Sequence, residues 1–359
     1  MAHIQLENIT KTFGKHTALR GLNLEVADGE FFVLLGQTGA GKTTTLRLIA
    51  GLEKPTEGRV LIDGHDVADW GAAERDVALV LQQYSLYPRY TVKQNLEFPL
   101  KSKLRRVPDA EIAERVDRVA RTLRISHLLA RKTDRLSGGE MQRVSIGRAI
   151  VRKPRVFLMD EPLSALDAKL REALRTELKS IQVNLGQTFL FVTHDQIEAM
   201  SMGDKIGVLN NGSLVQVGTP NEVYSNPRNT FVARAVGSPP MNLFDGTLAK
   251  GTAIVTPKAF ELPYDETPKG TTDGRTLVFG VRPEDVSLES GAPVEARVHD
   301  IENHGVEKIV TLRVGDHLLR ATAPARAKLD IDDTVRFGWN PKKVVLFDQA
   351  SGISLRHSA

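Results

Sequence analysis

Residues 36–43 read Gly-Gln-Thr-Gly-Ala-Gly-Lys-Thr, which matches the pattern G-x-x-x-x-G-K-[ST] at every fixed position. An apolar run at residues 31–35 precedes this stretch, and a helical stretch at residues 44–50 follows it and stops at Gly51. Glycines let the backbone wrap so closely that several N–H groups face one anion, and a helix N-terminus adds partial positive charge. The sequence therefore predicts a phosphate-binding loop.

Each position of this loop is a candidate for phosphate contact. We expect Lys42 to reach the β- and γ-phosphates of a nucleotide and the Thr43 hydroxyl to ligate Mg²⁺. The full set of predicted loop contacts is Gly36, Gln37, Thr38, Gly39, Ala40, Gly41, Lys42, Thr43 and Thr44.

The loop belongs to a longer alternation of strand-like and helical patterns. Residues 31–35, 156–159 and 189–192 are short, continuous apolar runs, which are typical of strands buried on both faces of a mainly parallel sheet. Up to about residue 235, helical patterns separate such runs. This predicts an α/β domain over residues 1–236, with a helical subdomain at about 88–155.

Polar residues follow three of the predicted strands. Asp160 and Glu161 end the run at 156–159, His194 ends the run at 189–193, and Gln82 follows residues 78–81. Ligands of open α/β sheets bind at the carboxyl ends of the strands. Asp160 therefore suits a magnesium carboxylate, Glu161 a base for an attacking water, and His194 a hydrogen bond to the γ-phosphate. Gln82 alone is consistent with a surface glutamine.

The pattern changes after residues 237–240, Gly-Ser-Pro-Pro. Short strand-like runs separated by turns then dominate, for example at 276–279, 309–314 and 344–347. This predicts a second, β-rich domain over residues 241–359, built as a small barrel or sandwich.

Composition excludes several classes of protein. The chain has 359 residues, 48 of them basic and 44 acidic, and no cysteine. The net charge of +4 is too small to indicate a nucleic-acid partner, and the densest basic run, residues 101–106, has no interleaved aromatic residue. Without cysteine there are no disulfides or thiolate metal sites. We find no signal peptide and no apolar run of about 18 residues, so the chain is not expected to span a membrane.

A second glycine-rich turn, Leu-Ser-Gly-Gly-Glu at residues 136–140, also opens a predicted helix. Ser137 and Glu140 have the spacing of a capping box, which would account for these two residues. It does not account for Gly138 and Gly139, because glycine in a helix costs about 1 kcal/mol relative to alanine. An anion at this helix N-terminus is the alternative explanation.

Taken together, these motifs resemble the ATP-binding cassette (ABC) transporter ATPases, in which they occur in the same order. The resemblance covers nearly the whole chain and is greatest to the subfamily typified by the maltose-importer ATPase. Three stretches carry the finer match: residues 82–88, Gln-Gln-Tyr-Ser-Leu-Tyr-Pro; residues 193–200, Thr-His-Asp-Gln-Ile-Glu-Ala-Met; and residues 280–285, Gly-Val-Arg-Pro-Glu-Asp. The subfamily's P-loop domain is followed by an all-β domain resembling the oligonucleotide/oligosaccharide-binding (OB) fold, which serves dimer contact and regulation.

The resemblance implies a role for each matching residue. Phe13 would stack on adenine, Gln82 would contact Mg²⁺ and water, and Glu161 would be the catalytic base. Asp167 would lie at a dimer interface, and His194 would be the switch histidine. Ser137, Gly138 and Gly139 would contact ATP held by the opposite subunit.

The sequence also departs from the family's usual pattern at three positions. Gln37 and Ala40 replace commoner residues in the loop, and neither position needs a side chain for the chemistry. Glu140 brings a negative charge near a phosphate site, so we expect it to turn away and cap its helix.

The resemblance implies an ATPase subunit of an importer, a translocase that hydrolyses ATP with Mg²⁺. It would work as a cytoplasmic homodimer on the inner face of the membrane, under two integral membrane permeases, with a solute-binding protein as an indirect partner. The subfamily mainly serves carbohydrates and related polar solutes, and the sequence does not name the solute. A soluble ABC ATPase acting on DNA or ribosomes is disfavoured, because such proteins usually carry tandem cassettes, a coiled-coil insertion or zinc cysteines. The β-rich C-terminal domain disfavours an exporter.

Overall fold

A computed structural model describes residues 2–102, 107–249, 252–255, 260–263 and 274–356, so most of the basic run at 101–106 lies outside the described residues. The chain divides into two compact units, Met1–Pro220 and Asn221–Ala359. The domain boundary predicted between residues 236 and 241 lies within the second unit and stays a prediction. No helix of the described residues is long and apolar enough to cross a membrane.

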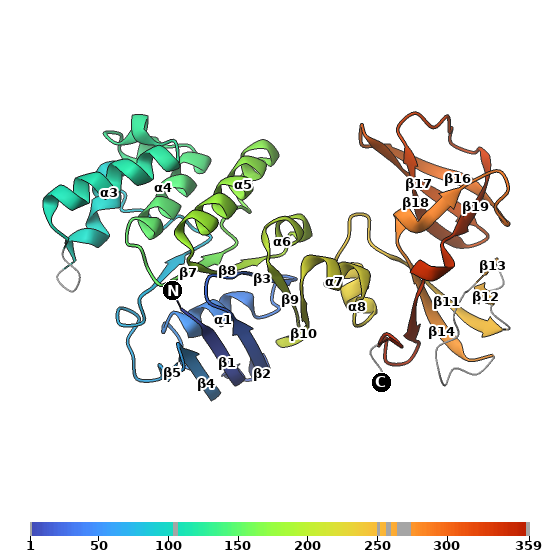
Figure 1. Cartoon of the computed structure of the whole chain (residues 1–359), viewed down its shortest axis with the longest axis horizontal. Helices are drawn as coiled ribbons and strands as arrows, with labels where there is room; N and C mark the ends of the chain where they lie inside the picture. Colours follow the sequence, from blue (N-terminus) through green and yellow to red (C-terminus); the bar gives the residue numbers. More distant parts are fainter. Residues whose placement is uncertain (1, 103–106, 250–251, 256–259, 264–273, 357–359) are drawn as a thin grey trace. The chain divides into compact units, whose positions relative to one another are not determined.

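The first unit is built on a mainly parallel sheet (Figure 1). In the described part of this unit its six strands lie in the order β10-β9-β3-β8-β7-β6, and only β10 runs antiparallel to its neighbour. The strands are β3 (Phe31–Gly36), β6 (Val77–Val80), β7 (Val156–Asp160), β8 (Thr188–Thr193), β9 (Lys205–Asn210) and β10 (Ser213–Gly218). Every residue of β3, β7 and β8 is buried, which confirms the mainly parallel sheet predicted from the apolar runs.

A smaller antiparallel sheet completes the core of the first unit. Its strand order is β2-β1-β4-β5, with β1 at Ile4–Phe13, β2 at His16–Val26, β4 at Glu57–Ile62 and β5 at His65–Asp66. Side chains of β1, of β3 and of helix α1 (Lys42–Ile49) meet in one buried hydrophobic cluster that includes Ile4, Leu34 and Leu46. This packing fixes the start of α1 against the end of β3, which is where the phosphate loop lies.

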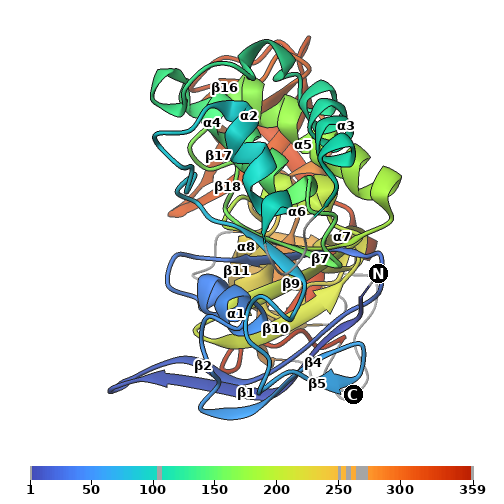
Figure 2. The same cartoon turned by 90° about the vertical axis from the view of Figure 1, so that its left-hand side faces the viewer.

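The other α-helices that follow lie between strands of the parallel sheet along the chain, as the alternation of apolar runs and helical patterns predicted. They are α2 (Val92–Glu97), α3 (Asp109–Thr122), α4 (Gly138–Ile150), α5 (Ala168–Leu185) and α6 (Gln196–Met202). One face of α3, which includes Ile112, Val116 and Val119, is buried, and Pro108 is the N-cap residue of this helix. Figures 1 and 2 show α3 and α4 at the end of the unit opposite β1 and β2.

The second unit is all-β apart from helices α7 (Pro220–Ser225) and α8 (Thr230–Ala235) and two short 3₁₀ turns in its described residues. One antiparallel sheet has the order β13-β12-β11-β14-β20 and the other the order β15-β19-β16-β17-β18. The strands of the two sheets are β11 (Asn242–Ala249), β12 (Thr252–Val255), β13 (Glu261–Pro263), β14 (Thr276–Val281), β15 (Val286–Leu288), β16 (Val294–Asn303), β17 (Glu307–Val314), β18 (His317–Pro324), β19 (Thr334–Trp339) and β20 (Val345–Asp348). Their inner faces share a core that contains Phe279 and Phe337, as predicted for a small barrel or sandwich.

Arg282 gives a physical reason for the motif at residues 280–285. Arg282 is 3% exposed, and its guanidinium donates to the carbonyl oxygens of Val236, Ala233 and Tyr224. A side chain at Gly237, whose φ is +112°, would collide with this guanidinium. Arg282 therefore ties α7 and α8 to the β strands of the same unit.

Candidate active site

The phosphate loop has the backbone that its glycines predict. Gly39 and Gly41 have φ values of +83° and +108°, which L side chains rarely adopt. A Cβ at Gly41 would lie 2.7 Å from a methyl group of Leu19 and 2.8 Å from the carbonyl oxygen of Ala18. Gly41 is also the N-cap of α1 and offers no side chain to the first N–H groups of that helix. These N–H groups are thus available to an anion.

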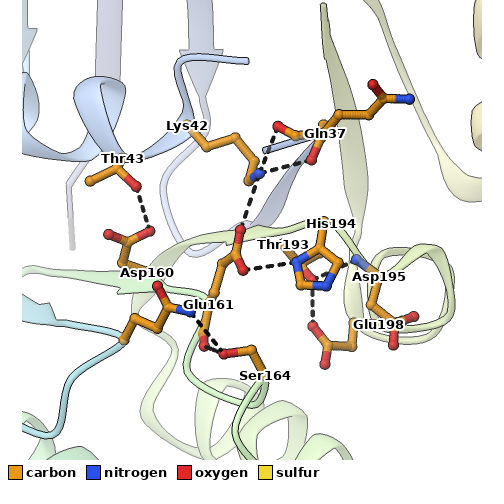
Figure 3. A network of polar contacts seen from close by, with 12 residues as sticks. Gln37, Lys42, Thr43, Asp160, Glu161, Ser164, Thr193, His194, Asp195 and Glu198 are labelled. Atoms are coloured by element: carbon orange, nitrogen blue, oxygen red, sulfur yellow. Dashed lines mark hydrogen bonds and ion pairs between the residues drawn. The ribbon is translucent and has the colours of Figure 1, made fainter. Parts of the chain in front are cut away.

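Lys42 is held inside the site by three oxygen atoms (Figure 3). Its Nζ donates to the carbonyl oxygens of Gly36 at 2.8 Å and Gln37 at 3.1 Å, and lies 3.1 Å from Oε1 of Glu161. The residue is 5% exposed. A buried ammonium is costly unless it is paired, so these oxygens stabilise Lys42 until an anion replaces them.

Thr43 and Asp160 meet at the carboxyl end of β7. The Thr43 hydroxyl donates to Oδ1 of Asp160 at 3.0 Å, and Asp160 is 7% exposed. Burial raises the pKa of Asp160, while the hydrogen bond from Thr43 acts in the opposite direction. A divalent cation beside this carboxyl group would stabilise its ionised form.

The donor set fits Mg²⁺ that is bound together with a phosphate. The described residues contain no group of three or more His, Cys, Asp or Glu side chains that could hold a metal by itself. Mg²⁺ commonly binds through one or two carboxylates plus substrate phosphates and waters. The carboxylate of Asp160 and the hydroxyl of Thr43 supply ligands of this kind next to the loop.

Glu161 lies between Lys42 and His194 (Figure 3). Its Oε2 is 2.8 Å from Nδ1 of His194, while its Oε1 faces Lys42. The backbone φ of Glu161 is +45°, a conformation that costs a residue other than glycine about 1–3 kcal/mol and is concentrated at functional sites. The structure thus brings together the three strand-end residues that the sequence selected, Asp160, Glu161 and His194, with the phosphate loop.

Gln82 lies at the margin of this cluster. It is exposed, and its Nε2 is 3.5 Å from Oγ of Ser164, the outer limit of a hydrogen bond. Ser164 in turn donates to the backbone oxygen of Glu161 at 2.9 Å. Gln82 is thus linked to Glu161 through Ser164.

Other predicted residues lie apart from the cluster and have partners of their own. Phe13 is 43% exposed at the end of β1, with Nζ of Lys11 4.6 Å from the centre of its ring. Asp167 caps α5, since its carboxylate accepts a hydrogen bond from the N–H of Leu170 at 2.9 Å. Neither arrangement involves the phosphate loop.

The turn at 136–140 forms the capping box predicted for it. The Glu140 N–H donates to the Ser137 hydroxyl, and the Ser137 N–H donates to the Glu140 carboxylate. Glu140 thus turns back onto its own helix, as expected. Among the described residues, none of the hydrogen bonds or ion pairs found joins this turn to the phosphate loop of the same chain.

The two glycines of this turn have neighbours within the chain that the sequence did not reveal. A Cβ at Gly139 would lie 2.1 Å from Cδ2 of Leu170 on α5, so Leu170 would have to move. A Cβ at Gly138 would meet only the hydroxyl of Tyr84, at 3.1 Å. Packing against α5 therefore explains Gly139 without an anion, and Gly138 is the glycine that remains open to the anion explanation.

Glu198 is a further polar residue beside the site, and the sequence reasoning missed it. It is 2% exposed on α6, and its carboxylate accepts a hydrogen bond from the Thr193 hydroxyl at 2.6 Å. Burial raises the pKa of Glu198. The available signal was its position four residues after His194, next to apolar Ala199 on a short helix.

A groove borders the segment that follows Gln82. It has a volume of about 320 Å³, and its walls include Leu81, Tyr87, Phe98 and Arg148. The Tyr87 and Phe98 rings pack at 4.4 Å, and Arg148 lies over the Tyr87 ring and donates to the carbonyl oxygen of Ser85 at 2.6 Å. Helix α4 and the segment after Gln82 therefore form walls of this groove.

Comparisons with known proteins match both parts of the chain. A model of the ABC transporter family matches residues 19–164, a model of the MalK OB fold domain matches 237–286, and a model of the TOBE domain matches 279–347. The trehalose/maltose import ATP-binding protein of Thermococcus litoralis is 48% identical, covering 98% of this chain and 99% of that protein. A xylose/arabinose import ATP-binding protein of Haloferax volcanii is 43% identical over 99% of this chain and 96% of the relative. The sn-glycerol-3-phosphate import ATP-binding protein of Bordetella avium is 43% identical over 94% of each.

Solved structures of ATP-binding cassettes match 60% of the chain. A dimeric ATP-binding cassette in a post-hydrolysis state with bound ADP and Pi has a TM-score of 0.55 and 33% identity, covering 60% of this chain and 98% of that one. A second dimeric bacterial ABC transporter cassette has a TM-score of 0.56 and 34% identity, with the same coverage.

Proposed function

The chain belongs to the ABC transporter family of ATP-binding subunits, and we propose that it hydrolyses ATP to drive uptake of a carbohydrate or related polar solute through partner permeases. The observation that carries the chemistry is the placement of Glu161 between Lys42 and His194, beside the Thr43–Asp160 pair. ATP is the nucleotide that the family binds. The roles of the individual residues below are part of the proposal.

ATP binding would exchange the partners of Lys42. The β- and γ-phosphates take over the ammonium from Gly36, Gln37 and Glu161, and the loop N–H groups at the start of α1 bind the same phosphates. Loss of the Lys42 contact leaves one oxygen of Glu161 free to accept a proton from a water. The same step that binds ATP thereby prepares the base.

Thr43, Asp160 and Gln82 would hold Mg²⁺, which supplies positive charge that stabilises the negative charge on the phosphates during transfer. His194 keeps its contact with Glu161 through Nδ1 and turns its other ring nitrogen toward the γ-phosphate. Phe13, which is exposed, would stack on the adenine ring.

The site needs a second copy of the chain. We infer that Ser137, Gly138 and Gly139 of one copy face the γ-phosphate held by the loop of the other, with Asp167 at the interface. Two observations support this: the turn at 136–140 makes none of the hydrogen bonds or ion pairs found with the loop of its own chain, and the two solved cassettes above are described as dimeric.

The transport role rests on the relatives. Their names specify import of trehalose/maltose, xylose/arabinose and sn-glycerol-3-phosphate, so a carbohydrate or related polar solute is the class we propose. Two integral membrane permeases would bind the groove beside Tyr87 and Phe98 and hold the dimer on the inner face of the membrane. A solute-binding protein would be an indirect partner.

Two measurements test this proposal. The purified chain should hydrolyse ATP in the presence of Mg²⁺, and Lys42→Ala should abolish binding and turnover. A tagged copy isolated from detergent-treated membranes should bring two integral membrane proteins with it. An active ATPase that instead co-purifies with ribosomes or DNA and with no membrane protein would contradict the transport role.

A further inference from the structure

The turn that carries His194 is fixed on one side by a buried carboxylate (Figure 3). Thr193 donates its hydroxyl to Glu198 at 2.6 Å, and the same oxygen accepts a hydrogen bond from the N–H of Asp195 at 2.9 Å. Glu198 is 2% exposed on α6, which begins directly after this turn. The Thr193 hydroxyl group, which precedes His194, therefore contacts both Asp195, which follows His194, and Glu198 on α6.

Arg171, in the first turn of α5, holds the same turn from a second side. Its Nη1 lies 3.6 Å from Oδ2 of Asp195, while its Nη2 donates to the carbonyl oxygen of Leu166 at 2.9 Å. The other carboxylate oxygen of Asp195 caps α6 by accepting hydrogen bonds from two backbone N–H groups. Asp195 is thus bound both to α6 and to Arg171.

These contacts connect two turns of the proposed site. Leu166 immediately precedes Asp167, and Asp195 immediately follows His194. The planar guanidinium of Arg171 presents several donors in a fixed fork, which suits simultaneous contact with a carbonyl group and a carboxylate. Its Nε is buried and has no hydrogen-bond partner among the described residues, so one donor remains for a carboxylate that moves toward it.

We propose that Arg171 is a positioning residue that couples the turn at Asp167 to the turn at His194. The inference rests on the proposed function, in which Asp167 lies at the interface with a second copy and His194 faces the γ-phosphate. When the second copy displaces the Asp167 turn, Arg171 transmits the movement to Asp195 and so to the His194 ring. Closure of the dimer and orientation of His194 then occur together.

The test is a double-mutant cycle on ATP turnover by the full-length protein. Arg171→Met keeps the length of the side chain and removes both contacts, while Asp195→Asn keeps an oxygen that caps α6 and removes the ion pair. Each change is expected to lower kcat about tenfold with little change in KM for ATP. Because both act through one contact, the double variant should lose no more than either single variant.

Arg175→Met is the matched control. Arg175 lies one helical turn further along α5, and no hydrogen bond or ion pair of its side chain is found among the described residues, so kcat should not change. Thermal unfolding of each variant separates positioning from folding. Additive losses in the cycle, or a lower Tm with unchanged kcat for Arg171→Met, would show that Arg171 only supports α5 and would overturn the proposal.

A second background ties the effect to His194. In a His194→Ala protein, Arg171→Met should cause no further loss of kcat, and a further tenfold loss would contradict action through that residue. These experiments distinguish failure of the Arg171 coupling from failure of the proposed function. If the wild-type chain does not hydrolyse ATP, or does so equally well with Lys42→Ala, the proposed function is wrong; if both behave as expected and Arg171→Met is fully active, only the coupling is wrong.

Discussion

Two glycine-rich turns of this chain each open a helix, and they do so for different reasons. At residues 36–43, Gly39 and Gly41 have φ values that only glycine adopts readily, and α1 begins without a side-chain cap. At residues 136–140, Gly138 and Gly139 are helical, and Ser137 and Glu140 satisfy each other's N–H groups. The first turn leaves backbone donors for a ligand, while the second already satisfies two of its own.

The surroundings of the two turns differ in the same way. Two carboxylates at the end of β7 reach the first turn, where Asp160 pairs with Thr43 and Glu161 with Lys42, and His194 at the end of β8 contacts Glu161. The side chains close to the glycines of the second turn are those of Tyr84, Leu166 and Leu170 of the same chain. One chain therefore brings together the polar groups around the first turn, whereas we propose that the second turn gains a chemical role when another copy supplies a phosphate.

The largest expected effect is at Glu161. Glu161→Gln should lower ATP turnover by about 10²-fold or more, since the amide cannot accept the proton of the attacking water. ATP binding should persist, because Lys42, Thr43 and the loop N–H groups are unchanged. Single-turnover kinetics and equilibrium nucleotide binding measure the two quantities, with Glu172→Gln on the exposed face of α5 as the control for loss of a charge. Near-normal turnover would show that Glu161 is not the base. The first turn would then lack the reactive side chain that distinguishes it from the second turn.

Matched alanine substitutions test the backbone contrast directly. Gly41→Ala should lower the free energy of unfolding by about 2 kcal/mol or more, because φ is +108° and the new methyl group meets Leu19 and Ala18. Gly138→Ala should change it little, since the backbone is already helical and only the Tyr84 hydroxyl must shift. Urea unfolding of both variants gives the comparison. Equal losses would mean that the second turn is as conformationally constrained as the first.

Much of the first turn could be predicted from the sequence because its signals are local. The apolar runs at 31–35, 156–159 and 189–192 became buried strands, and the polar residues after them converge, since parallel strands place their carboxyl ends at one edge. The capping box of Ser137 and Glu140 is equally local, and it is confirmed.

The features that the sequence did not reveal depend on contacts between distant segments. Gly139 packs against Leu170, some thirty positions away, so its meaning changes only when α4 and α5 are placed together. The pairing of Lys42 with Glu161 and the burial of Glu198 likewise follow from tertiary packing. The positive φ of Glu161 has no compositional signal at all, because glutamate rarely adopts it.

The smallest expected effects are in stability, and they have opposite signs in the two regions. Burial raises the pKa of Glu198, so the folded state holds its proton more tightly than the unfolded state and stability from this group falls as pH rises above about 4.5. Hydrogen bonds from Ser137 lower the pKa of Glu140, so its contribution is present above about 4.5 and is lost as pH falls through the lowered pKa.

Substitution of Glu198 or Glu140 by glutamine should reveal the sign of each contribution to stability in thermal unfolding. At pH 7.5, Glu198→Gln should match or exceed the wild-type Tm, because the amide oxygen still accepts from Thr193 without a buried charge. Glu140→Gln should lower Tm slightly. The Glu198 difference should shrink as pH falls toward 4.5, whereas the Glu140 difference should persist down to about pH 4.5 and shrink only below it. The same sign at both positions would contradict the distinction between the buried carboxylate of Glu198 and the half-buried helix cap of Glu140.

The measurement that tests the central claim most directly is nucleotide occlusion by mixed dimers. One chain carries Lys42→Ala and its partner carries Gly138→Asp, which places a carboxylate where a phosphate is expected. Gly138 is preferred to Gly139 because a side chain there meets only the Tyr84 hydroxyl and leaves Leu170 in place.

If the turn at 136–140 faces the phosphate loop of the other chain, both defects fall on one composite site and the second site is intact. The mixed dimer should then occlude ATP at that second site, as should each variant paired with wild type. If each turn serves the loop of its own chain, every site of the mixed dimer carries one defect. A mixed dimer that occludes no nucleotide, while both pairings with wild type still do, would contradict the account and leave the turn at 136–140 as a helix cap alone.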